Sequence, residues 1–199
     1  PPKPLRGRQD ALAEIERWMS GGTQWLTIVG PGGMGKTHLA RAAAAGRPAV
    51  WCDLRAVSTE TEVIASIGEA LGLATTAKLD DDAARVVQAL GALNPELVVL
   101  DNLEQIDAAA LSRVHEWLDE LPQGRFLATS RQPTRLPRET VLRLDVLTAQ
   151  ASRALFEERA RAITGSSSTW GSDVLDGLMA QLGGLPLAIE LAAGRMGIL

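Results

Sequence analysis

Over residues 1–147, short apolar runs alternate with longer segments in which apolar side chains recur every three or four positions. The runs predict strands at residues 23–30, 49–54, 96–102, 125–131 and 140–147. The periodic segments predict helices at residues 36–46, 58–72, 83–93 and 107–121, and the acidic residues 80–82 are expected to be a link before the third of them. Strands that alternate with helices in this way predict a mostly parallel sheet covered by helices on both faces, an α/β domain.

The pattern changes after residue 147, where only helical periodicity remains. Thr148 is expected to cap a helix, the stretch "GSSSTWGS" to form a flexible loop, and two more helices to follow it. We therefore predict two units, a nucleotide-binding α/β domain at residues 1–147 and a helical lid subdomain at residues 148–199.

The first predicted strand leads into a glycine-rich turn that carries the clearest chemistry. Its spacing is that of the phosphate-binding pattern G-x-x-x-x-G-K-[ST], between a strand and a helix. Glycines let backbone N–H groups surround a phosphate, and the positive end of the following helix dipole adds to this attraction. The predicted binding residues are Gly30, Pro31, Gly32, Gly33, Met34, Gly35, Lys36 and Thr37, with His38 beside them on the first helical turn.

Two of these side chains have predicted roles with ATP and Mg²⁺. Lys36 would reach the β- and γ-phosphates, and the hydroxyl of Thr37 would ligate Mg²⁺. Asp101 ends the apolar strand "LVVLD" and is the expected second magnesium ligand. No guanine-reading N-K-x-D motif occurs, so adenine is the expected base.

Three residues near the strand ends are candidates for hydrolysis or for sensing the γ-phosphate. Asn102 cannot accept a proton from water but could orient one, and Glu104 is the nearest acid that could act as general base. Glu104 is also a reasonable solvated loop residue. Arg131 follows the fourth strand and is either a γ-phosphate contact or a surface arginine.

Composition narrows the classes of protein. The net charge of −4 argues against a dominant nucleic-acid surface, and no apolar run is long enough to span a membrane. Cys52 is the one cysteine and stands in an apolar run, which suits a buried thiol in a reducing compartment. The chain lacks a first methionine and a signal peptide, so we expect a cytoplasmic piece of a longer protein.

With these motifs the chain resembles the STAND class of P-loop ATPases, the NB-ARC and NACHT-like signalling switches related to AAA+ proteins. It is most similar to the branch found in large bacterial transcriptional regulators. The blocks that carry the resemblance are "LRGRQDALAEIERWM", "VGPGGMGKTHLA", "LVVLDNLEQI", "FLATSR", "LDVLTAQASRALFEERA" and "GGLPLAIELAA".

The resemblance implies a five-stranded sheet of order 5-1-4-3-2 and a sensor role for Arg131. It also implies that Pro186 packs near the adenine and that the segment from Leu5 to Arg8 lines the adenine and ribose side. Relatives carry an acid where Gln9 stands, and often a second acid at the position of Asn102, so slow rather than fast hydrolysis is expected. They continue into a winged-helix region beyond the end of this chain.

The function predicted from the resemblance is a Mg²⁺-dependent ATP/ADP switch that hydrolyses ATP slowly. Effector and sensor domains would lie outside the chain, and the ATP form is expected to form homo-oligomers, without direct nucleic-acid or membrane binding by this segment. Two alternatives stay open. One is an AAA+ ATPase that loads or remodels nucleic-acid complexes, and the other is a nucleotide-binding scaffold that does not hydrolyse ATP.

Overall fold

The computed structural model describes residues 5–76, 78–165 and 171–197. Most of the predicted loop "GSSSTWGS" lies outside these ranges. The helices are α1 (Gln9–Met19), α2 (Lys36–Ala44), α3 (Glu60–Ala70), α4 (Leu79–Leu93), α5 (Ala108–Glu120), α6 (Ala149–Thr164), α7 (Ser172–Leu182) and α8 (Pro186–Gly194), with short 3₁₀ turns η1 (Leu103–Gln105) and η2 (Arg195–Gly197). The strands are β1 (Trp25–Val29), β2 (Ala49–Asp53), β3 (Leu97–Asp101), β4 (Phe126–Ser130) and β5 (Glu139–Arg143).

The five strands form one parallel sheet in the order β2-β3-β4-β1-β5. This is the predicted order 5-1-4-3-2 read from the other edge, so the predicted fold of a P-loop NTPase is confirmed. Every residue of β1, β3 and β4 is buried, as expected for central strands covered on both faces.

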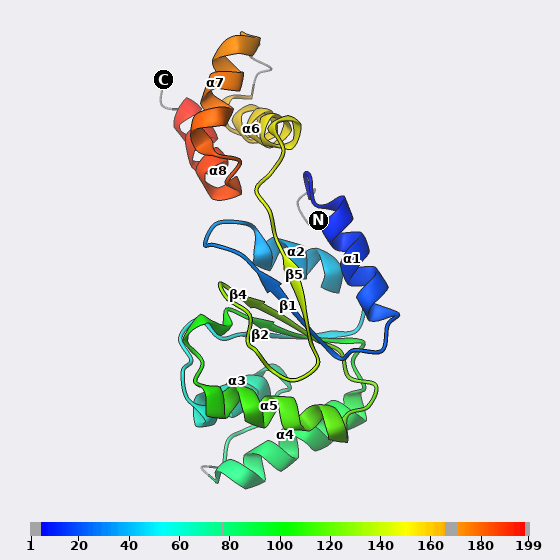
Figure 1. Cartoon of the computed structure of the whole chain (residues 1–199). Helices are drawn as coiled ribbons and strands as arrows, with labels where there is room; N and C mark the ends of the chain where they lie inside the picture. The colour runs from blue at the N-terminus through cyan, green and yellow to red at the C-terminus, as the bar shows by residue number, and fades with distance from the viewer. Residues whose placement is uncertain (1–4, 77, 166–170, 198–199) are drawn as a thin grey trace.

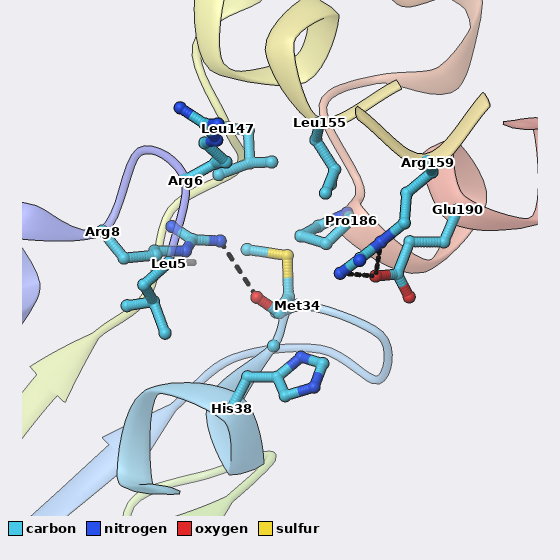
Figure 2. A pocket seen from close by; sticks show the side chains of 11 residues that line it. Leu5, Arg6, Arg8, Met34, His38, Leu147, Leu155, Arg159, Pro186 and Glu190 are labelled. Carbon is cyan, nitrogen blue, oxygen red and sulfur yellow. Dashed lines mark hydrogen bonds and ion pairs between the residues drawn. The ribbon is translucent and has the colours of Figure 1, made fainter. Parts of the chain in front are cut away.

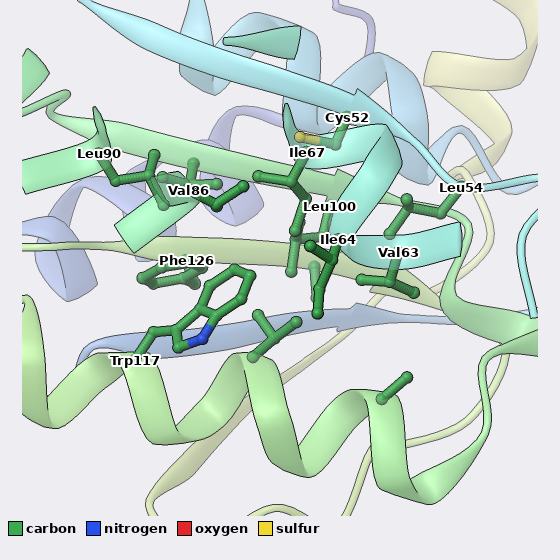
Figure 3. Close-up of a cluster of buried hydrophobic side chains, with 14 of the residues drawn as sticks. Cys52, Leu54, Val63, Ile64, Ile67, Val86, Leu90, Leu100, Trp117 and Phe126 are labelled. Atoms are coloured by element: carbon green, nitrogen blue, oxygen red, sulfur yellow. The ribbon is translucent and has the colours of Figure 1, made fainter. Parts of the chain in front are cut away.

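Alternation along the strands divides the core of the sheet into two layers. Trp25, Leu100 and Phe126 face one layer together with α3, α4 and α5 (Figure 3). Leu26 and Val99 face the opposite layer, which α1 and α2 cover (Figure 1). Since successive side chains of a strand point to opposite faces, each of the central strands β1, β3 and β4 contributes to both layers.

The structure differs from the sequence pattern at two places. The acidic residues 80–82 are not a link but the first turn of α4, where carboxylates are favoured by the positive end of the helix dipole. Residues 9–19 form α1, which the strand and helix pattern had not included, and which buries Ile15 and Trp18 on one side. Two predicted caps are present, because the side chains of Asp107 and Thr148 accept N–H groups of α5 and α6.

Helices α6 to α8 stand beyond the sheet and have a hydrophobic cluster of their own, built around Phe156, Leu175 and Ile189 (Figure 1). The chain enters this unit directly from β5 through residues 144–148. This cluster also includes Leu147, and the division between residues 147 and 148 stays a prediction.

Candidate nucleotide site

The candidate site lies at the carboxyl ends of β1, β3 and β4, where the loops of a parallel sheet converge. The turn from β1 to α2 contains Gly33 and Gly35 at φ values of +79° and +86°, a backbone conformation that side chains other than glycine rarely adopt. Gly35 is the residue that precedes α2, so the first N–H groups of that helix open toward the cleft. Between the two glycines, the side chain of Met34 is buried.

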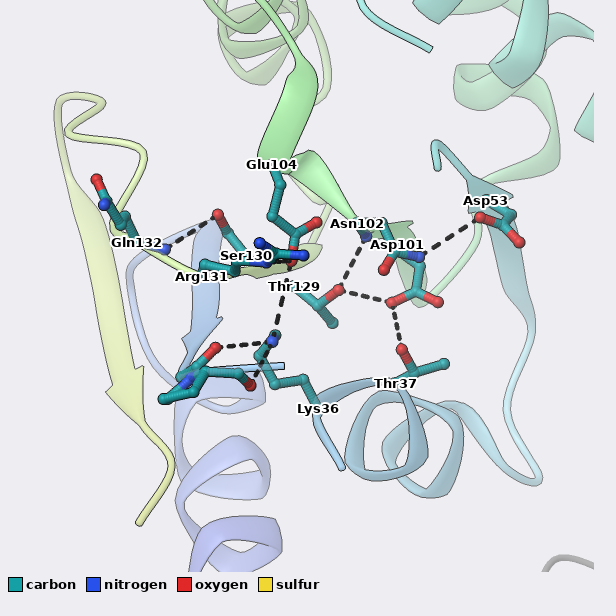
Figure 4. A network of polar contacts seen from close by, with 12 residues as sticks. Lys36, Thr37, Asp53, Asp101, Asn102, Glu104, Thr129, Ser130, Arg131 and Gln132 are labelled. Carbon is teal, nitrogen blue, oxygen red and sulfur yellow. Dashed lines mark hydrogen bonds and ion pairs between the residues drawn. The ribbon is translucent and has the colours of Figure 1, made fainter. Parts of the chain in front are cut away.

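Lys36 is held at the centre of this turn (Figure 4). Its Nζ donates hydrogen bonds to the carbonyl oxygens of Gly30 and Pro31 at 2.7 and 3.1 Å, and lies 3.9 Å from Oε1 of Glu104. Burial lowers the pKa of Lys36, while the Glu104 carboxylate opposes that shift and the Arg131 guanidinium adds to it. The ammonium group is therefore positioned by the two backbone carbonyls at the base of the cleft.

Gly30 and Pro31 do not line the larger cavity beside the turn, unlike most of the other predicted phosphate-binding residues. The N–H of Gly30 donates to the carbonyl of Ser130, as an extension of the sheet, so it does not point at the cleft. Both residues meet Lys36 through their carbonyl oxygens. They orient the lysine, whereas Gly32, Gly33 and Gly35 line the cleft itself.

The predicted magnesium ligands meet in one hydrogen-bonded group. Oδ1 of Asp101 accepts hydrogen bonds from Oγ1 of Thr37 at 2.9 Å and from Oγ1 of Thr129 at 2.6 Å. Asp101 is only 2% exposed, and Thr129 is fully buried. A carboxylate and a hydroxyl are hard oxygen ligands of the kind that Mg²⁺ prefers, so Thr37 and Asp101 fit this ion.

Asn102 adopts a left-handed conformation at φ +71°, which asparagine tolerates better than most residues. This turn directs its backbone N–H to Oγ1 of Thr129 at 2.9 Å. Its side-chain Nδ2 lies 3.5 Å from Oδ1 of Asp53, the residue paired with Asp101 on the neighbouring strand β2. The amide group of Asn102 thus lies at the rim of the cleft and contacts Asp53.

Glu104 stands between the two cations of the site (Figure 4). Its Oε1 is 3.9 Å from Nζ of Lys36 and 3.8 Å from Nε of Arg131. The Arg131 side chain is 70% exposed, against 19% for Glu104. The structure therefore brings together Lys36, Glu104 and Arg131, which are far apart in the sequence.

Two cavities that share lining residues lie beside the glycine-rich turn. The larger is open to solvent, has an empty volume of about 1040 Å³ and is lined by Lys36, Thr37, Asp101, Asn102, Glu104 and Arg131, among others. The smaller has an empty volume of about 450 Å³, and its walls include Leu5, Arg8, Met34, Leu147, Leu155 and Pro186 (Figure 2). The first cavity is polar and cationic at its base, and the second is mainly apolar.

Arg8 contributes to the smaller cavity but is not among the residues at the phosphate end. Its guanidinium is buried and donates to the carbonyl of Met34 at 2.9 Å and to that of Asp145 at 2.6 Å. Burial lowers the pKa of Arg8, and the Asp145 carboxylate partly offsets this. Arg8 thereby ties the glycine-rich turn to the segment that leads from β5 to α6.

The helical unit touches the glycine-rich turn directly. The N–H of Leu187 donates to the carbonyl of Gly33 at 3.2 Å, and a Cβ on Gly33 would lie 2.9 Å from the Leu187 side chain. At the base of the unit, the N–H of Leu147 donates to the carbonyl of Gly184 at 2.9 Å. The segment "GGLPLA" is therefore packed against both the turn and the link from β5.

A chain of alternating charges along the smaller cavity is a feature that the motifs did not predict. Arg6 pairs with Glu158 at 2.9 Å, Glu158 lies 3.7 Å from Arg159, and Arg159 pairs with Glu190 at 2.9 Å. These residues come from the N-terminal segment, α6 and α8, so no local pattern links them. The sequence offers one signal for Glu190: it stands four residues after Pro186, so a helix puts the two residues on the same face and hence both toward the predicted adenine site.

Within the described ranges of the chain, none of the helices combines the length and the apolar character needed to cross a bilayer.

The sequence profile of the AAA domain family matches residues 19–136, which is more than half of the chain. An uncharacterized protein of Mycobacterium tuberculosis is 31% identical over 95% of this chain and 50% of its own length. A second protein of that species, provisionally named an HTH-type transcriptional regulator, is 29% identical over 86% of this chain and 20% of its own length. The chain thus spans half or less of the curated relatives it matches.

Solved structures with the same fold include three proteins of low sequence identity. Cdc6p from Pyrobaculum aerophilum aligns with a TM-score of 0.72 at 18% identity, over 98% of this chain and 64% of that one. The ORC1 protein of Aeropyrum pernix, solved in complex with DNA, gives 0.69 at 20% identity over 99% and 61%. A STAND protein with a tetratricopeptide repeat sensor from Pyrococcus horikoshii gives 0.61 at 19% identity over 95% and 30%.

Proposed function

The chain belongs to the AAA domain family of P-loop ATPases, and from that premise we propose that it is the Mg²⁺-dependent ATP/ADP switch of a STAND-type regulatory protein. The observation that carries the proposal is the contact of the helical unit with the phosphate turn. Leu187 binds Gly33 through the backbone, and Pro186, Leu187 and Glu190 line the same cleft as Lys36. A shift of the glycine-rich turn when the bound phosphates change would therefore act directly on the helical unit.

Nucleotide binding follows from the groups at the base of the cleft. The N–H groups of the glycine-rich turn and the N-terminus of α2 would bind the phosphates, and Lys36 would turn from the carbonyls of Gly30 and Pro31 toward the β- and γ-phosphates. Thr37 and Asp101 would hold Mg²⁺. When bound, the ion neutralises phosphate charge and orients the terminal phosphate.

Hydrolysis requires a water in line with the bond between the β- and γ-phosphates. Glu104 would accept the proton of that water as the water oxygen bonds to the γ-phosphorus and ADP departs with the bridging oxygen. In the structure Glu104 lies near Lys36 and Arg131, so the carboxylate would have to release these cations to the phosphate first. We therefore expect slow turnover, with Asn102 aiding the orientation of the water.

Switching follows from the difference between ATP and ADP. Only ATP presents a γ-phosphate to Lys36 and to Arg131, whose side chain is 70% exposed. A ligand shifts a conformational equilibrium only through contacts that differ between states, and these are the differential contacts here. Arg131 would then report the γ-phosphate, while Pro186 and the smaller cavity would hold the adenine.

The wider role rests on likeness to other proteins. The provisional regulator of Mycobacterium tuberculosis and the archaeal STAND protein support a place in a regulatory protein with effector and sensor domains beyond this chain. We propose a cytoplasmic setting, homo-oligomers in the ATP form, and no direct nucleic-acid binding by this segment.

A loader or remodelling ATPase is the second candidate. It is favoured by the higher TM-scores with Cdc6p and with the DNA-bound ORC1 protein than with the STAND protein. A non-hydrolysing scaffold is the third, because Asn102 stands where the NB-ARC proteins that the chain resembles often carry a second acid. The three candidates differ in what the purified chain holds and in how fast it turns ATP over.

The first experiment is to purify the chain without added nucleotide, denature it, and identify the released small molecule by chromatography. Near-stoichiometric ADP, followed by slow phosphate release when ATP and Mg²⁺ are supplied, is the expected result. An empty site with rapid turnover that rises with DNA would instead favour the loader. Equal affinity for ATP and ADP without any turnover would identify a scaffold.

Variants separate binding from hydrolysis in the same assay. Lys36→Ala is expected to release the nucleotide, whereas Glu104→Gln is expected to keep it and to lose phosphate release. Glu96→Gln is the matched control, since this glutamate lies at the opposite end of β3 and should leave both readouts unchanged. Turnover that survives Glu104→Gln would remove Glu104 from the proposed chemistry.

A further inference from the structure

The two cavities of the nucleotide site share four lining residues, Gly35, His38, Pro186 and Glu190. On one side of this junction lie Lys36, Thr37 and Asp101, and on the other lie the apolar walls that include Met34. In a nucleotide, the ribose is the part that joins the phosphates to the base. If phosphates occupy the first cavity and the base the second, the ribose stands at the junction.

Glu190 is the carboxylate at this junction (Figure 2). Its Oε1 accepts a hydrogen bond from Nε of Arg159 at 2.9 Å, and Nη2 of the same guanidinium lies 2.9 Å from that oxygen as an ion pair. Its second oxygen, Oε2, accepts no hydrogen bond from the parts of the chain that the structure describes. The Glu190 side chain is 30% exposed, so it is partly removed from water yet open to the cavity.

The pairing with Arg159 decides what this carboxylate can do beside an anionic ligand. An unpaired carboxylate would repel the phosphates, but the guanidinium of Arg159 neutralises that charge while leaving Oε2 as an acceptor. The ribose carries two neighbouring hydroxyl groups, both of which donate hydrogen bonds. A free carboxylate oxygen with its charge balanced by an arginine is well suited to accept one of them.

We propose that Glu190 is a specificity-determining residue that accepts a hydrogen bond from a ribose hydroxyl and so selects ribonucleotides over deoxynucleotides. The proposal rests on the assignment of this cleft as the nucleotide site. Arg159 acts as the positioning residue, because its hydrogen bond from Nε and the ion pair from Nη2 both hold Oε1 of the carboxylate.

The test compares affinities within each protein by titration calorimetry. ADP, 2′-deoxy-ADP, 3′-deoxy-ADP and inosine diphosphate are titrated into the nucleotide-free chain and into Glu190→Ala. A lost hydrogen bond to a charged acceptor corresponds to roughly a tenfold or larger change in Kd. The wild-type chain is expected to bind at least one deoxy analogue about tenfold more weakly than ADP, and Glu190→Ala is expected to bind ADP and both analogues equally.

Glu157→Ala is the matched control, because Glu157 is also on the helical unit, pairs with Arg153 and lines neither cavity. It should keep the wild-type preference. Since each preference is a ratio within one protein, a general loss of affinity or stability in a variant does not imitate the expected result.

Three outcomes would overturn the inference. The first is equal binding of ADP and both deoxy analogues by the wild-type chain. The second is a preference for ADP over a deoxy analogue that persists in Glu190→Ala. The third is an effect of Glu190→Ala on the binding of inosine diphosphate alone, which would mean that Glu190 contacts the base. Failure of the wild-type chain to bind any of the four ligands would instead overturn the nucleotide site itself, and the inference with it.

Discussion

Thr129 links the carboxyl ends of β4 and β3 in the candidate nucleotide site through hydrogen bonds to Asp101 and Asn102. Replacing Thr129 with valine tests this link. The side chain is fully buried, donates to Oδ1 of Asp101 at 2.6 Å and accepts the backbone N–H of Asn102 at 2.9 Å. Valine has nearly the same shape but can make neither bond. The variant therefore isolates the hydroxyl group from the packing around it.

The expected cost can be worked out from these two bonds. A hydrogen bond to a buried carboxylate contributes about 1.5–3 kcal/mol, and leaving the Asn102 N–H without its acceptor costs about 1 kcal/mol more. The sum is about 3 kcal/mol, which for a domain of this size corresponds to a fall in Tm of about 6–12 °C. Thr129→Ser keeps the hydroxyl and removes one methyl group, so it should cost about 1 kcal/mol, or about 2–4 °C.

Scanning calorimetry of the chain and both variants at neutral pH measures these values. The expected order of Tm is wild type, then Thr129→Ser, then Thr129→Val. If the serine and valine variants melted together, the loss would come from packing, and the hydrogen bonds to Asp101 and Asn102 would not hold the strand ends as argued. A valine variant as stable as the wild type would refute the estimate altogether.

Three further predictions concern the fold around the site. Hydrogen bonds from Ser58 and Thr59, just before α3, lower the pKa of Glu62 from its ordinary 4.5 to about 2. Its charged form therefore stabilises the folded chain above about pH 4.5, and this contribution is lost as the pH falls toward 2. Melting curves of the wild type and Glu62→Gln should therefore differ at pH 6 and converge near pH 2. Burial raises the pKa of the Cys52 thiol to about 12, so mass spectrometry should find no labelling by iodoacetamide at pH 8 until urea is added. Gly33→Ala should lower the Tm, because Gly33 has a φ of +79° and a Cβ there would lie 2.9 Å from the Leu187 side chain. Gly32→Ala is the control and should melt like the wild type, because a Cβ on Gly32 would meet nothing within 4 Å.

The sequence predicted the strands and the phosphate turn because both are encoded locally. Five apolar runs and one glycine pattern are enough to specify a βαβ sheet and the turn after its first strand. The order of the strands came from the resemblance to known ATPases, and the structure confirms it. The helical unit after Thr148 was visible in the change of periodicity.

What the sequence did not reveal depends on contacts between distant segments. The amide of Asn102 faces Asp53 only because β2 and β3 are neighbours in register, and Glu104 meets both Lys36 and Arg131 only after the strand ends converge. The acidic residues 80–82 were misread because a run of aspartates resembles a polar link as much as a first helical turn.

The place where the helical unit joins the sheet has a mechanical consequence. The start of α8 is held at the glycine-rich turn by the Leu187–Gly33 hydrogen bond, and the segment before α6 is held to the segment before α8 by the Leu147–Gly184 hydrogen bond. Helix α6 has 16 residues and spans about 24 Å. A tilt of about 10° at its first turn displaces its last turn by about 4 Å, given a rise of about 1.5 Å per residue. A small movement at the glycine-rich turn would therefore be enlarged along α6, and α7, which packs against α6, would move with it.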